Sequence, residues 1–347
     1  MKFDIAGNAV FKEDVYLAEH CSFEIGGKAR AFVLPRTMEE LQSAMELCSA
    51  QGRPYYIFGY GSNILFPDSP ANDTVYISLK HMIDCQWSKD RGEQTIFLTS
   101  GVPLSFLALI GMLCKYEKLL FAYLLPGSVG AGVYINAKCY DDQMSGVIEK
   151  IHYIDPEDLM SGIQTLSADQ CEFAYKKSIF QRRPWIVVGV DLAVPGINGE
   201  IFAMIQAMLT QYQMGKSDIT KMQQFYRHFY ALAAEASDKY QIELPQQFTK
   251  IDRDRNGKQH FSYPSCGSVF KNNYAYGKPM GVLIDQLNLK GKSFGGAMIS
   301  PHHGNFIVNY QHAKASDVLY LIQYTQDAVN QAYGFVPEPE VIILSGD

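Results

Sequence analysis

The first clear pattern of hydrophobic and polar positions is that of an amphipathic helix. Thr37 is a favourable N-cap and is followed by two acidic residues in the first turn. Apolar residues then recur at spacings of three and four as far as Cys48, which predicts a helix that ends near Gly52. Residues 55–58 (YYIF) predict a short strand that opens into a glycine-rich turn at residues 59–63. This order of elements is typical of α/β units.

Short runs of β-branched and aromatic residues predict further strands. These runs occupy residues 74–79, 94–99, 151–154 and 185–194. Pro103 suits the start of a helix that extends to about residue 118, and residues 316–333 have the pattern of an amphipathic helix that stops at Gly334. Residues 200–237 are compatible with helix but differ in composition, which suggests a domain boundary near residues 195–196.

Composition and charge narrow the function classes. The length of 347 residues predicts two or three domains. A net charge of -6 argues against a broad nucleic-acid-binding surface, although one local pocket can still hold a small anion. The seven cysteines are scattered and never spaced as C-x-x-C, which argues against disulfides and structural zinc. The N-terminus does not resemble a signal peptide and no apolar stretch is long enough to span a bilayer, so we expect a cytoplasmic protein without membrane insertion.

Two glycine-rich turns are candidates for ligand binding. Residues 59–63 (GYGSN) lack both the G-x-G-x-x-G spacing and the P-loop lysine. Glycines in such a turn let backbone N–H groups approach an oxyanion, but a turn of this kind also occurs as simple punctuation after a strand. Residues 126–132 (PGSVGAG) have the same two interpretations. Together the turns favour one diphosphate-bearing cofactor that lies across both.

Eight segments resemble, in the same order, the motifs of the UDP-N-acetylenolpyruvoylglucosamine reductase (MurB) family. They are residues 21–30 (CSFEIGGKAR), 59–65 (GYGSNIL), 126–137 (PGSVGAGVYINA), 171–180 (CEFAYKKSIF), 263–272 (YPSCGSVFKN), 283–291, 303–309 (HGNFIVN) and 338–341 (EPEV). The likeness extends over nearly the whole chain. No single segment is specific, but eight in the family's order are very unlikely by chance.

The resemblance implies an α+β fold with three parts. Two subdomains, residues 1–80 and 81–198, would form an FAD-binding cradle of the vanillyl-alcohol-oxidase (PCMH-like) type. Residues 199–334 would form a C-terminal α+β substrate domain, and the tail, residues 335–347, would pack near the active site. The implied reaction is the reduction of UDP-N-acetylglucosamine enolpyruvate to UDP-N-acetylmuramate by NADPH through bound FAD, in peptidoglycan precursor synthesis. We expect a monomeric enzyme with no nucleic-acid partner.

The resemblance also implies roles for individual residues. Ser268 would be the proton donor, and Glu340 and Lys176 would polarise or hold the substrate carboxylate. The implied FAD-binding residues are Gly59, Tyr60, Gly61, Ser62, Asn63, Pro126, Gly127, Ser128, Gly130, Ala131, Asn136 and Ala137. Tyr175, Lys271 and Asn272 would contact the substrate. The adjacent histidines 302 and 303 do not predict a metal site, because neighbouring side chains point in different directions.

The chain departs from the family pattern at several of these positions. Lys176 stands where the family has arginine, and lysine lacks the planar fork that binds a carboxylate through two hydrogen bonds. Tyr60, Leu124, Lys138 and Asp141 replace glycines, which adds bulk where backbone approaches a pyrophosphate. Residues 195–215 contain no clear equivalent of the tyrosine-bearing loop found in part of the family. The sequence therefore resembles the type that lacks this loop.

Two alternative functions remain open at the level of sequence. One is an FAD-dependent oxidoreductase with the same cradle and another substrate, which would not require Ser268 and Glu340 together. The other is a degenerate homologue that binds a nucleotide sugar without turnover, for which the lost glycines and Lys176 are the support. Flavin absorbance of the purified protein and substrate-dependent NADPH oxidation distinguish these possibilities.

Overall fold

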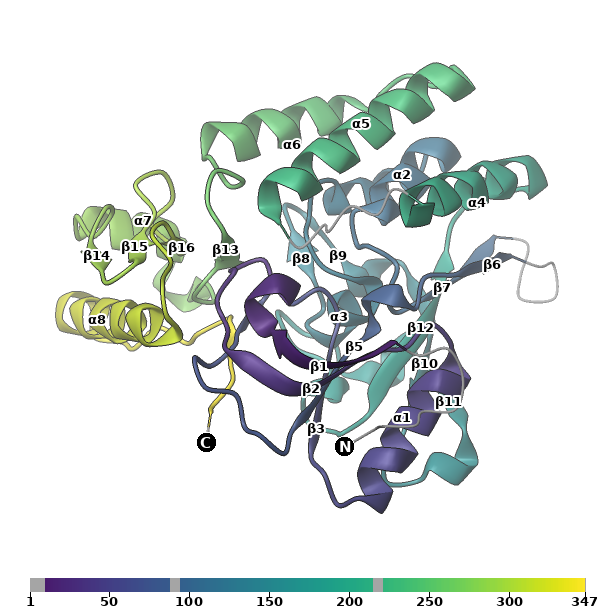
Figure 1. The fold of residues 1–347 in the computed structure, drawn as a ribbon. Helices are drawn as coiled ribbons and strands as arrows, with labels where there is room; N and C mark the ends of the chain where they lie inside the picture. Colours follow the sequence, from purple (N-terminus) through teal and green to yellow (C-terminus); the bar gives the residue numbers. More distant parts are fainter. Residues whose placement is uncertain (1–9, 88–93, 215–220, 347) are drawn as a thin grey trace.

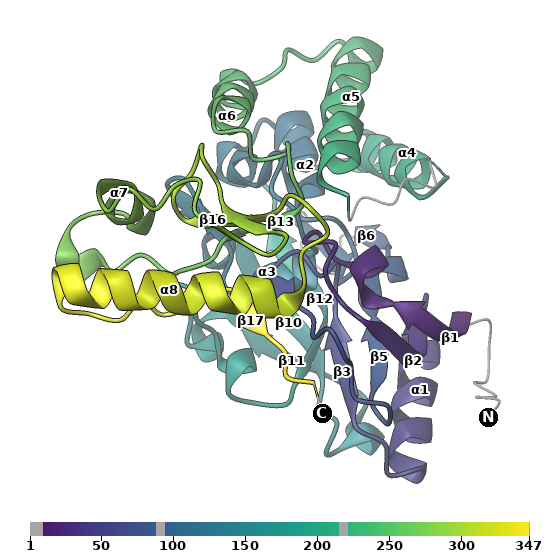
Figure 2. The same ribbon diagram turned by 60° about the vertical axis from the view of Figure 1, so that its left-hand side comes forward.

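The computed structural model describes residues 10–87, 94–214 and 221–346. Its three larger sheets are surrounded by helices, and segments from distant parts of the sequence meet at the centre (Figures 1 and 2). The mixture of parallel and antiparallel strands with separate helical layers agrees with the predicted α+β class.

The first unit is a four-stranded sheet with one helix packed against it. Its elements are β1 (Val10–Tyr16), β2 (Lys28–Leu34), α1 (Met38–Ala50), β3 (Tyr55–Phe58), β4 (Ile64–Leu65) and β5 (Val75–Ser78). The order is β1-β2-β5-β3, with β1 antiparallel and the others parallel. Thr37 caps α1 by accepting a hydrogen bond from the backbone N of Glu40 at 3.3 Å. The predicted helix and the strand at residues 55–58 are confirmed.

The second unit is an antiparallel five-stranded sheet in the order β11-β10-β12-β7-β6. Its elements are β6 (Cys85–Trp87), β7 (Thr95–Thr99), α2 (Phe106–Cys114), α3 (Val129–Tyr134), β8 (Lys138–Cys139), β9 (Asp142–Gln143), β10 (Ile148–Ile154), β11 (Ile163–Ser167) and β12 (Ile186–Ala193). Helix α2 lies inside its predicted range. It ends at Cys114 because Lys115 adopts a left-handed conformation with φ 54° and closes the helix.

Three helices follow: α4 (Gly199–Met214), α5 (Met222–Tyr240) and α6 (Gln246–Gly257). They lie together beside α2 (Figure 1). Their apolar residues, including Leu209, Phe229 and Ile251, belong to the same hydrophobic core as α2. The predicted domain boundary at residue 199 stays a prediction, but this packing favours a different division. We propose that these helices belong to the second unit and that the third unit begins near residue 259.

The third unit consists of a small sheet, ordered β13-β16-β15-β14, and two helices. Its elements are β13 (Ser265–Ser268), α7 (Met280–Gln286), β14 (Ser293–Phe294), β15 (Ala297–Ile299), β16 (Phe306–Asn309), α8 (Ala315–Tyr333) and β17 (Ile342–Ile343). Helix α8 ends at Gly334, which has φ 77°, as predicted. Strand β17 returns to the first unit and pairs in parallel with β4. The first and third units therefore share one hydrophobic core.

All seven cysteines are free thiols. Within the described ranges, no helix combines the length and the apolar character that crossing a bilayer requires.

Candidate active site

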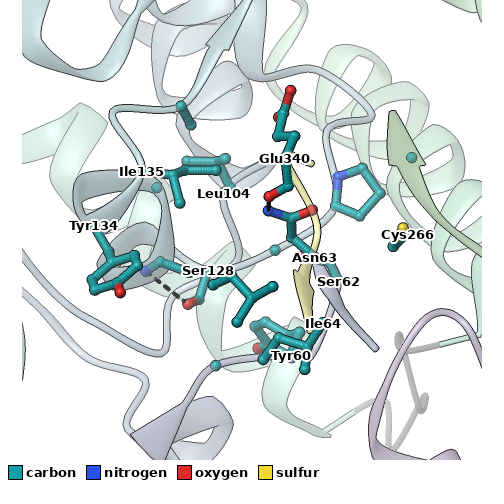
Figure 3. Close-up of a pocket in the computed structure, with 18 of the residues that line it drawn as sticks. Tyr60, Ser62, Asn63, Ile64, Leu104, Ser128, Tyr134, Ile135, Cys266 and Glu340 are labelled. Carbon is teal, nitrogen blue, oxygen red and sulfur yellow. Dashed lines mark hydrogen bonds between the residues drawn. The ribbon is translucent and has the colours of Figure 1, made fainter. Parts of the chain in front are cut away.

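A cavity of about 900 Å³ lies where the three units meet. Both glycine-rich turns, strand β13 and Glu340 of the tail contribute to its wall, and Figure 3 shows side chains from these separate segments facing one space. Eleven of the twelve residues predicted to bind the cofactor line this cavity. The fold therefore places the two turns in one site, as the sequence predicted.

The first turn is held in place by close backbone contacts that require Gly61. Gly61 has φ 63°, and a Cβ atom at this position would lie 2.6 Å from the backbone oxygen of His20 and 2.7 Å from the Cβ of Cys21. The backbone N of Ser22 donates to the Gly61 oxygen at 3.4 Å. At the end of the turn, Asn63 Nδ2 donates to the backbone oxygen of Glu340 at 3.0 Å, which connects the turn to the tail.

Tyr60 replaces a family glycine without filling the cavity. Its ring is buried in the core of the second unit, at the edge of the cavity. Its hydroxyl lies 3.0 Å from the Gly101 oxygen and 3.3 Å from both the Lys80 oxygen and the hydroxyl of Tyr212 on α4. The tyrosine thus ties the turn to α4, and its backbone remains available to a ligand.

Replacing Tyr60 with phenylalanine is expected to lower the free energy of unfolding by about 1 kcal/mol, since a buried hydroxyl loses its hydrogen bonds. Flavin content should stay unchanged, because the hydroxyl points into the core. Urea unfolding and the flavin absorbance of the purified variant measure the two effects. Tyr212→Phe is the matched variant, and the double variant should be less destabilised than the sum of the two. Loss of flavin at unchanged stability would contradict this assignment.

The second turn lies directly against residues 100–104. The backbone N of Gly130 donates to the Ser100 oxygen at 3.0 Å, and that of Leu104 donates to the Gly127 oxygen at 2.9 Å. A Cβ on Gly130 would lie 2.5 Å from the Cβ of Ser100, so only glycine permits this approach. The hydroxyl of Ser100 is buried at the cavity wall and has no hydrogen-bond partner among the described residues. An unsatisfied hydroxyl on the wall of a cavity that both glycine-rich turns line fits a polar, phosphate-bearing cofactor.

Leu124 and Asn136 explain two further features of this region. Leu124 has φ 55°, so it keeps the left-handed conformation that the family's glycine adopts readily.

Asn136 is buried and does not line the cavity with the other predicted cofactor residues. Its Nδ2 donates to the Ala174 oxygen at 3.0 Å, and its Oδ1 accepts from the Ser145 backbone N at 3.0 Å. Asn136 therefore supports the loop that carries Lys176.

An ion pair joins two of the predicted catalytic residues across the cavity wall. Lys176 Nζ lies 2.6 Å from Glu340 Oε1, and each side chain is only 13% exposed. The loop of Lys176 is closed by two reciprocal backbone hydrogen bonds between Ala174 and Lys177, both of 3.1 Å. The backbone N of Glu340 donates to the Val269 oxygen at 2.7 Å. A charge-assisted hydrogen bond between two largely buried groups fixes both side chains.

Ser268 is the third predicted catalytic residue, and it lines the same cavity. It ends strand β13 and pairs with Phe306 of β16. Gly267, with φ 80°, marks an irregularity in this pairing, where the ladder shifts between Ser265 and Ser268. The next residue, Val269, is the one that binds the backbone of Glu340. Strand β13 and the tail thus hold Ser268 and Glu340 in a common framework.

Of the three predicted substrate-binding residues, Tyr175 and Asn272 line the cavity. The Tyr175 hydroxyl accepts from the Asn272 backbone N at 3.4 Å, and burial raises the pKa of this phenol well above its usual range. Lys271 does not line the cavity in the part of the chain that the structure describes. Its Nζ lies instead 2.5 Å from Glu338 Oε1. The positive charge expected beside a nucleotide must therefore come from other residues.

Comparison with known proteins agrees with this geometry. The model of the FAD binding domain family matches residues 29–155, and that of the UDP-N-acetylenolpyruvoylglucosamine reductase C-terminal domain matches residues 259–344. The reductase of Treponema denticola is 33% identical over 332 residues, 94% of this chain and 90% of that protein. That of Clostridium botulinum (strain 657 / Type Ba4) is 30% identical over 341 residues, 98% of this chain and 94% of that protein. The chain belongs to the UDP-N-acetylenolpyruvoylglucosamine reductase family.

A solved structure shows the same fold. The reductase from Thermus caldophilus superposes with a TM-score of 0.66 at 24% sequence identity, covering 97% of this chain and all of that one. The predicted fold class and the FAD cofactor are confirmed. Within residues 195–215, where the sequence shows no equivalent of the tyrosine-bearing loop, residues 199–214 form helix α4.

A basic cluster on the cavity wall, formed by Arg255, Lys258, His260 and His303, is absent from the site residues that the sequence predicts. Arg255 is only 7% exposed, and its Nε has no hydrogen-bond partner among the described residues. Its Nη2 lies 3.4 Å from Cys139 Sγ. Arg255 belongs to α6 (Gln246–Gly257), a helix that the hydrophobic pattern described above does not predict separately. The spacing of Phe248, Ile251 and Arg255 was the signal that could have revealed its buried face.

The two histidines of the basic cluster predict loss of stability in acid. Burial, assisted by the charge of Arg255, lowers the pKa of His260 to about 3, and burial lowers that of His303 to about 4. In the unfolded chain both imidazoles have a pKa near 6.5, so the unfolded chain binds protons more tightly than the folded protein does. The stability of the fold therefore falls as pH drops from about 6.5 toward 4. We expect a smaller decrease in melting temperature between pH 7 and pH 5 for His260→Gln than for the unmodified protein.

The neighbouring exposed His302 provides the control for this prediction. His302→Gln should leave the pH dependence of the melting temperature unchanged, since His302 lies at the surface. If His260→Gln retained the full decrease, burial of its neutral form would not account for the acid sensitivity.

Proposed function

We propose that this chain catalyses the NADPH-dependent reduction of UDP-N-acetylglucosamine enolpyruvate to UDP-N-acetylmuramate, a step in peptidoglycan precursor synthesis. Membership of the reductase family supports this activity. The observation that carries the assignment of residues is the Lys176–Glu340 ion pair in the cavity that Ser268 and both glycine-rich turns line. Residues of the two glycine-rich turns, 59–63 and 126–131, would hold FAD, which when bound would supply the hydride chemistry.

Lys176 is proposed to stabilise the negative charge that develops when a hydride adds to the enolpyruvyl double bond. That addition converts the conjugated carboxylate into an enolate-like species whose charge lies largely on the carboxylate oxygens. A cation already fixed in a largely buried site stabilises this charge without reorganisation. Glu340 holds the ammonium group in position, and Asn136 and the closed backbone loop position the residue itself. The lysine supplies charge, whereas the family's arginine also supplies a planar fork.

Ser268 is proposed to donate the proton that completes the reduction at the second carbon. Its hydroxyl becomes a competent donor only beside a strongly basic carbanion, because a serine hydroxyl is a weak acid. The serine would regain its proton from solvent after the transfer. Balanced overall, one hydride and one proton add across the carbon–carbon double bond, and NADPH becomes NADP⁺.

The nucleotide part of the substrate requires positive charge, which we assign to Arg255 and Lys258. Both line the cavity; Arg255 lacks a carboxylate partner within ion-pair distance among the described residues, whereas Lys258 Nζ lies 2.7 Å from Oδ1 of Asp254, which lines the cavity too. A buried, unpaired guanidinium is unfavourable until an anion reaches it. Tyr175 and Asn272 remain proposed substrate contacts. Lys271 would act only indirectly, through its pair with Glu338.

We further propose that the protein works in the cytoplasm as a monomer. Seven free thiols and a requirement for NADPH suit a reducing compartment. Both glycine-rich turns, Ser268, Lys176 and Glu340 of one chain line the same cavity.

The direct test is NADPH oxidation by the purified flavoprotein with and without UDP-N-acetylglucosamine enolpyruvate. Oxidation that depends on this substrate and yields UDP-N-acetylmuramate supports the proposal. A flavin-containing protein that oxidises NADPH at the same rate without the substrate would favour another oxidoreductase activity. Binding of the nucleotide sugar without turnover would favour the degenerate homologue.

A further inference from the structure

The seven cysteines all lie within the described ranges, and one of them differs from the rest in its accessibility. Cys139 is partly exposed and lines the cavity, whereas each of the other six is at most 7% exposed. Burial raises the pKa of the thiols of Cys21 and Cys171 to about 11, and that of Cys85 and Cys114 to about 12. Buried thiols of this kind are chemically inert. Cys139 is therefore the thiol that a small reagent in the cavity reaches most easily.

A short hairpin and helix α6 fix the position of Cys139. Strands β8 and β9 pair antiparallel, with Cys139 opposite Asp142. In the turn between them, the Tyr140 hydroxyl donates to Asp254 Oδ2 at 3.2 Å, which docks the hairpin on α6. The next residue of that helix, Arg255, has its Nη2 3.4 Å from Cys139 Sγ. The fold thus places a cation against the thiol across 116 positions of the sequence.

The guanidinium of Arg255 has hydrogen-bonding capacity that the protein leaves unused. The residue is buried at the cavity wall, and its Nε has no hydrogen-bond partner among the residues that the structure describes. Both ring nitrogens of His260, on the same wall, are also buried without a partner in this part of the chain. The carboxylate of Asp254 is engaged by Tyr140 and by Lys258. Buried donors without an acceptor suit an added oxygen that carries negative charge.

Cys266 also lines the cavity, but its surroundings have the opposite effect (Figure 3). It is 6% exposed. Burial, and to a smaller extent the negative charge of Glu340, raise the pKa of its thiol well above the usual range. A nearby cation favours the thiolate, whereas burial and a nearby carboxylate favour the thiol. Of these two thiols on the cavity wall, Cys139 is therefore placed to react and Cys266 is protected.

We propose that Cys139 is a redox modification site, at which hydrogen peroxide converts the thiol to a sulfenic acid that Arg255 stabilises. The thiol releases its proton, and the thiolate sulfur attacks one oxygen of the peroxide. The O–O bond breaks, and the hydroxide that leaves takes up a proton to form water. The sulfur loses two electrons and the peroxide gains them. The oxygen added to the sulfur lies beside the guanidinium and accepts a charge-assisted hydrogen bond from it.

Oxidation of Cys139 also weakens binding of the nucleotide. This consequence rests on the proposed function, in which Arg255 holds the nucleotide part of the substrate. A guanidinium that is engaged by the sulfenic oxygen has fewer donors for a phosphate, and the added oxygen takes up space at the cavity wall. The modification itself depends neither on the substrate nor on turnover.

Mass spectrometry tests the assignment of the site. The full-length, flavin-containing protein is treated with hydrogen peroxide and with dimedone, which traps sulfenic acids. We expect the dimedone adduct on Cys139 at a level at least about tenfold above that on any other cysteine. Cys139→Ser should abolish this adduct, whereas Cys266→Ser, the matched control from the same wall, should leave it in place. Equal adducts on Cys139 and Cys266, or no adduct on Cys139, would overturn the proposal.

The rate of labelling tests the role of Arg255. Arg255→Gln removes the charge beside the thiol and should slow formation of the adduct about tenfold. Arg253→Gln is the matched control, because Arg253 is exposed on the same helix and does not line the cavity in the described part of the chain. Equal rates in Arg255→Gln and the unmodified protein would contradict the role of the guanidinium. The adduct on the unmodified chain tests the site without this variant, so the proposal stays falsifiable if Arg255→Gln does not fold.

Titration calorimetry with UDP tests the consequence for the nucleotide. Treatment with peroxide should raise the Kd for UDP about tenfold, and dithiothreitol should restore it. In Cys139→Ser, peroxide should leave the Kd unchanged. Equal loss of affinity in Cys139→Ser would assign the effect to another residue and contradict this consequence. Failure of the untreated protein to bind UDP would instead count against the proposed function, while the labelling of Cys139 would still decide the modification site.

Discussion

Replacing Ser268 with alanine is expected to lower kcat about 10²- to 10⁴-fold, the range typical for loss of a positioned general acid. The rest of the catalytic cycle should continue. NADPH should still reduce the bound FAD at its normal rate, because Ser268 is proposed to act only in proton transfer to the substrate. Separate stopped-flow measurements of flavin reduction by NADPH and of flavin reoxidation by the enolpyruvyl substrate distinguish the two half-reactions.

Ser265→Ala is the matched control for this variant. Both serines belong to β13, but Ser265 is buried, and its Oγ accepts a hydrogen bond from the backbone N of Gly267 at 3.4 Å. Its replacement should affect stability more than the rate of reoxidation. If Ser268→Ala slowed both half-reactions equally, Ser268 would be acting on the cofactor or on the fold, and its role as proton donor would have to be abandoned.

The second large effect is expected at the ion pair. Lys176→Ala should lower kcat/KM for the enolpyruvyl substrate by about 10²- to 10³-fold, comparable to removal of a preorganised donor from an oxyanion site. The substitution also leaves Glu340 as a largely buried carboxylate without its cation, which adds to the loss. Steady-state kinetics with saturating NADPH measures the change.

Two further variants sharpen this test. Lys176→Arg should retain substantial activity, because it restores the family's residue and keeps the charge. Glu338→Gln is the control for Glu340→Gln, since Glu338 is a neighbouring acid that pairs with Lys271 outside the cavity. We expect a strong loss of activity for Glu340→Gln and little change for Glu338→Gln. Unchanged turnover in Lys176→Ala would contradict the role of this residue.

Local sequence patterns predicted the helices and strands whose ends are set by interactions between residues close together in the sequence. The cap at Thr37, the strand at residues 55–58 and the stop at Gly334 all appear where hydrogen-bonding side chains, β-branched runs and glycine require them. These features need only neighbouring residues in the sequence for their interpretation. The family resemblance separately pointed to Ser268, Lys176 and Glu340, and all three line one cavity.

The features that the sequence did not reveal depend on contacts between distant segments. Asn136 matched a cofactor motif, but its amide supports the backbone beside Lys176. Lys271 lies in a motif beside Ser268, but it pairs with Glu338. Tyr60 replaces a family glycine, which suggested that its side chain would obstruct the cofactor site. Its hydroxyl instead forms a hydrogen bond with that of Tyr212, a contact that cannot be read from the sequence. In each case, the tertiary partner decides the direction of the side chain.

The link between Asn63 and Glu340 has a consequence for how the protein folds. These residues are 277 positions apart, and they meet where β4 and β17 form their parallel pair. Long-range parallel pairing is intrinsically slow, because the chain must close a large loop before the contact stabilises it. The first turn can form early from nearby residues, whereas Glu340 reaches Lys176 only after this closure. The ion pair of the proposed catalytic site therefore depends on the contact between two segments from opposite ends of the chain.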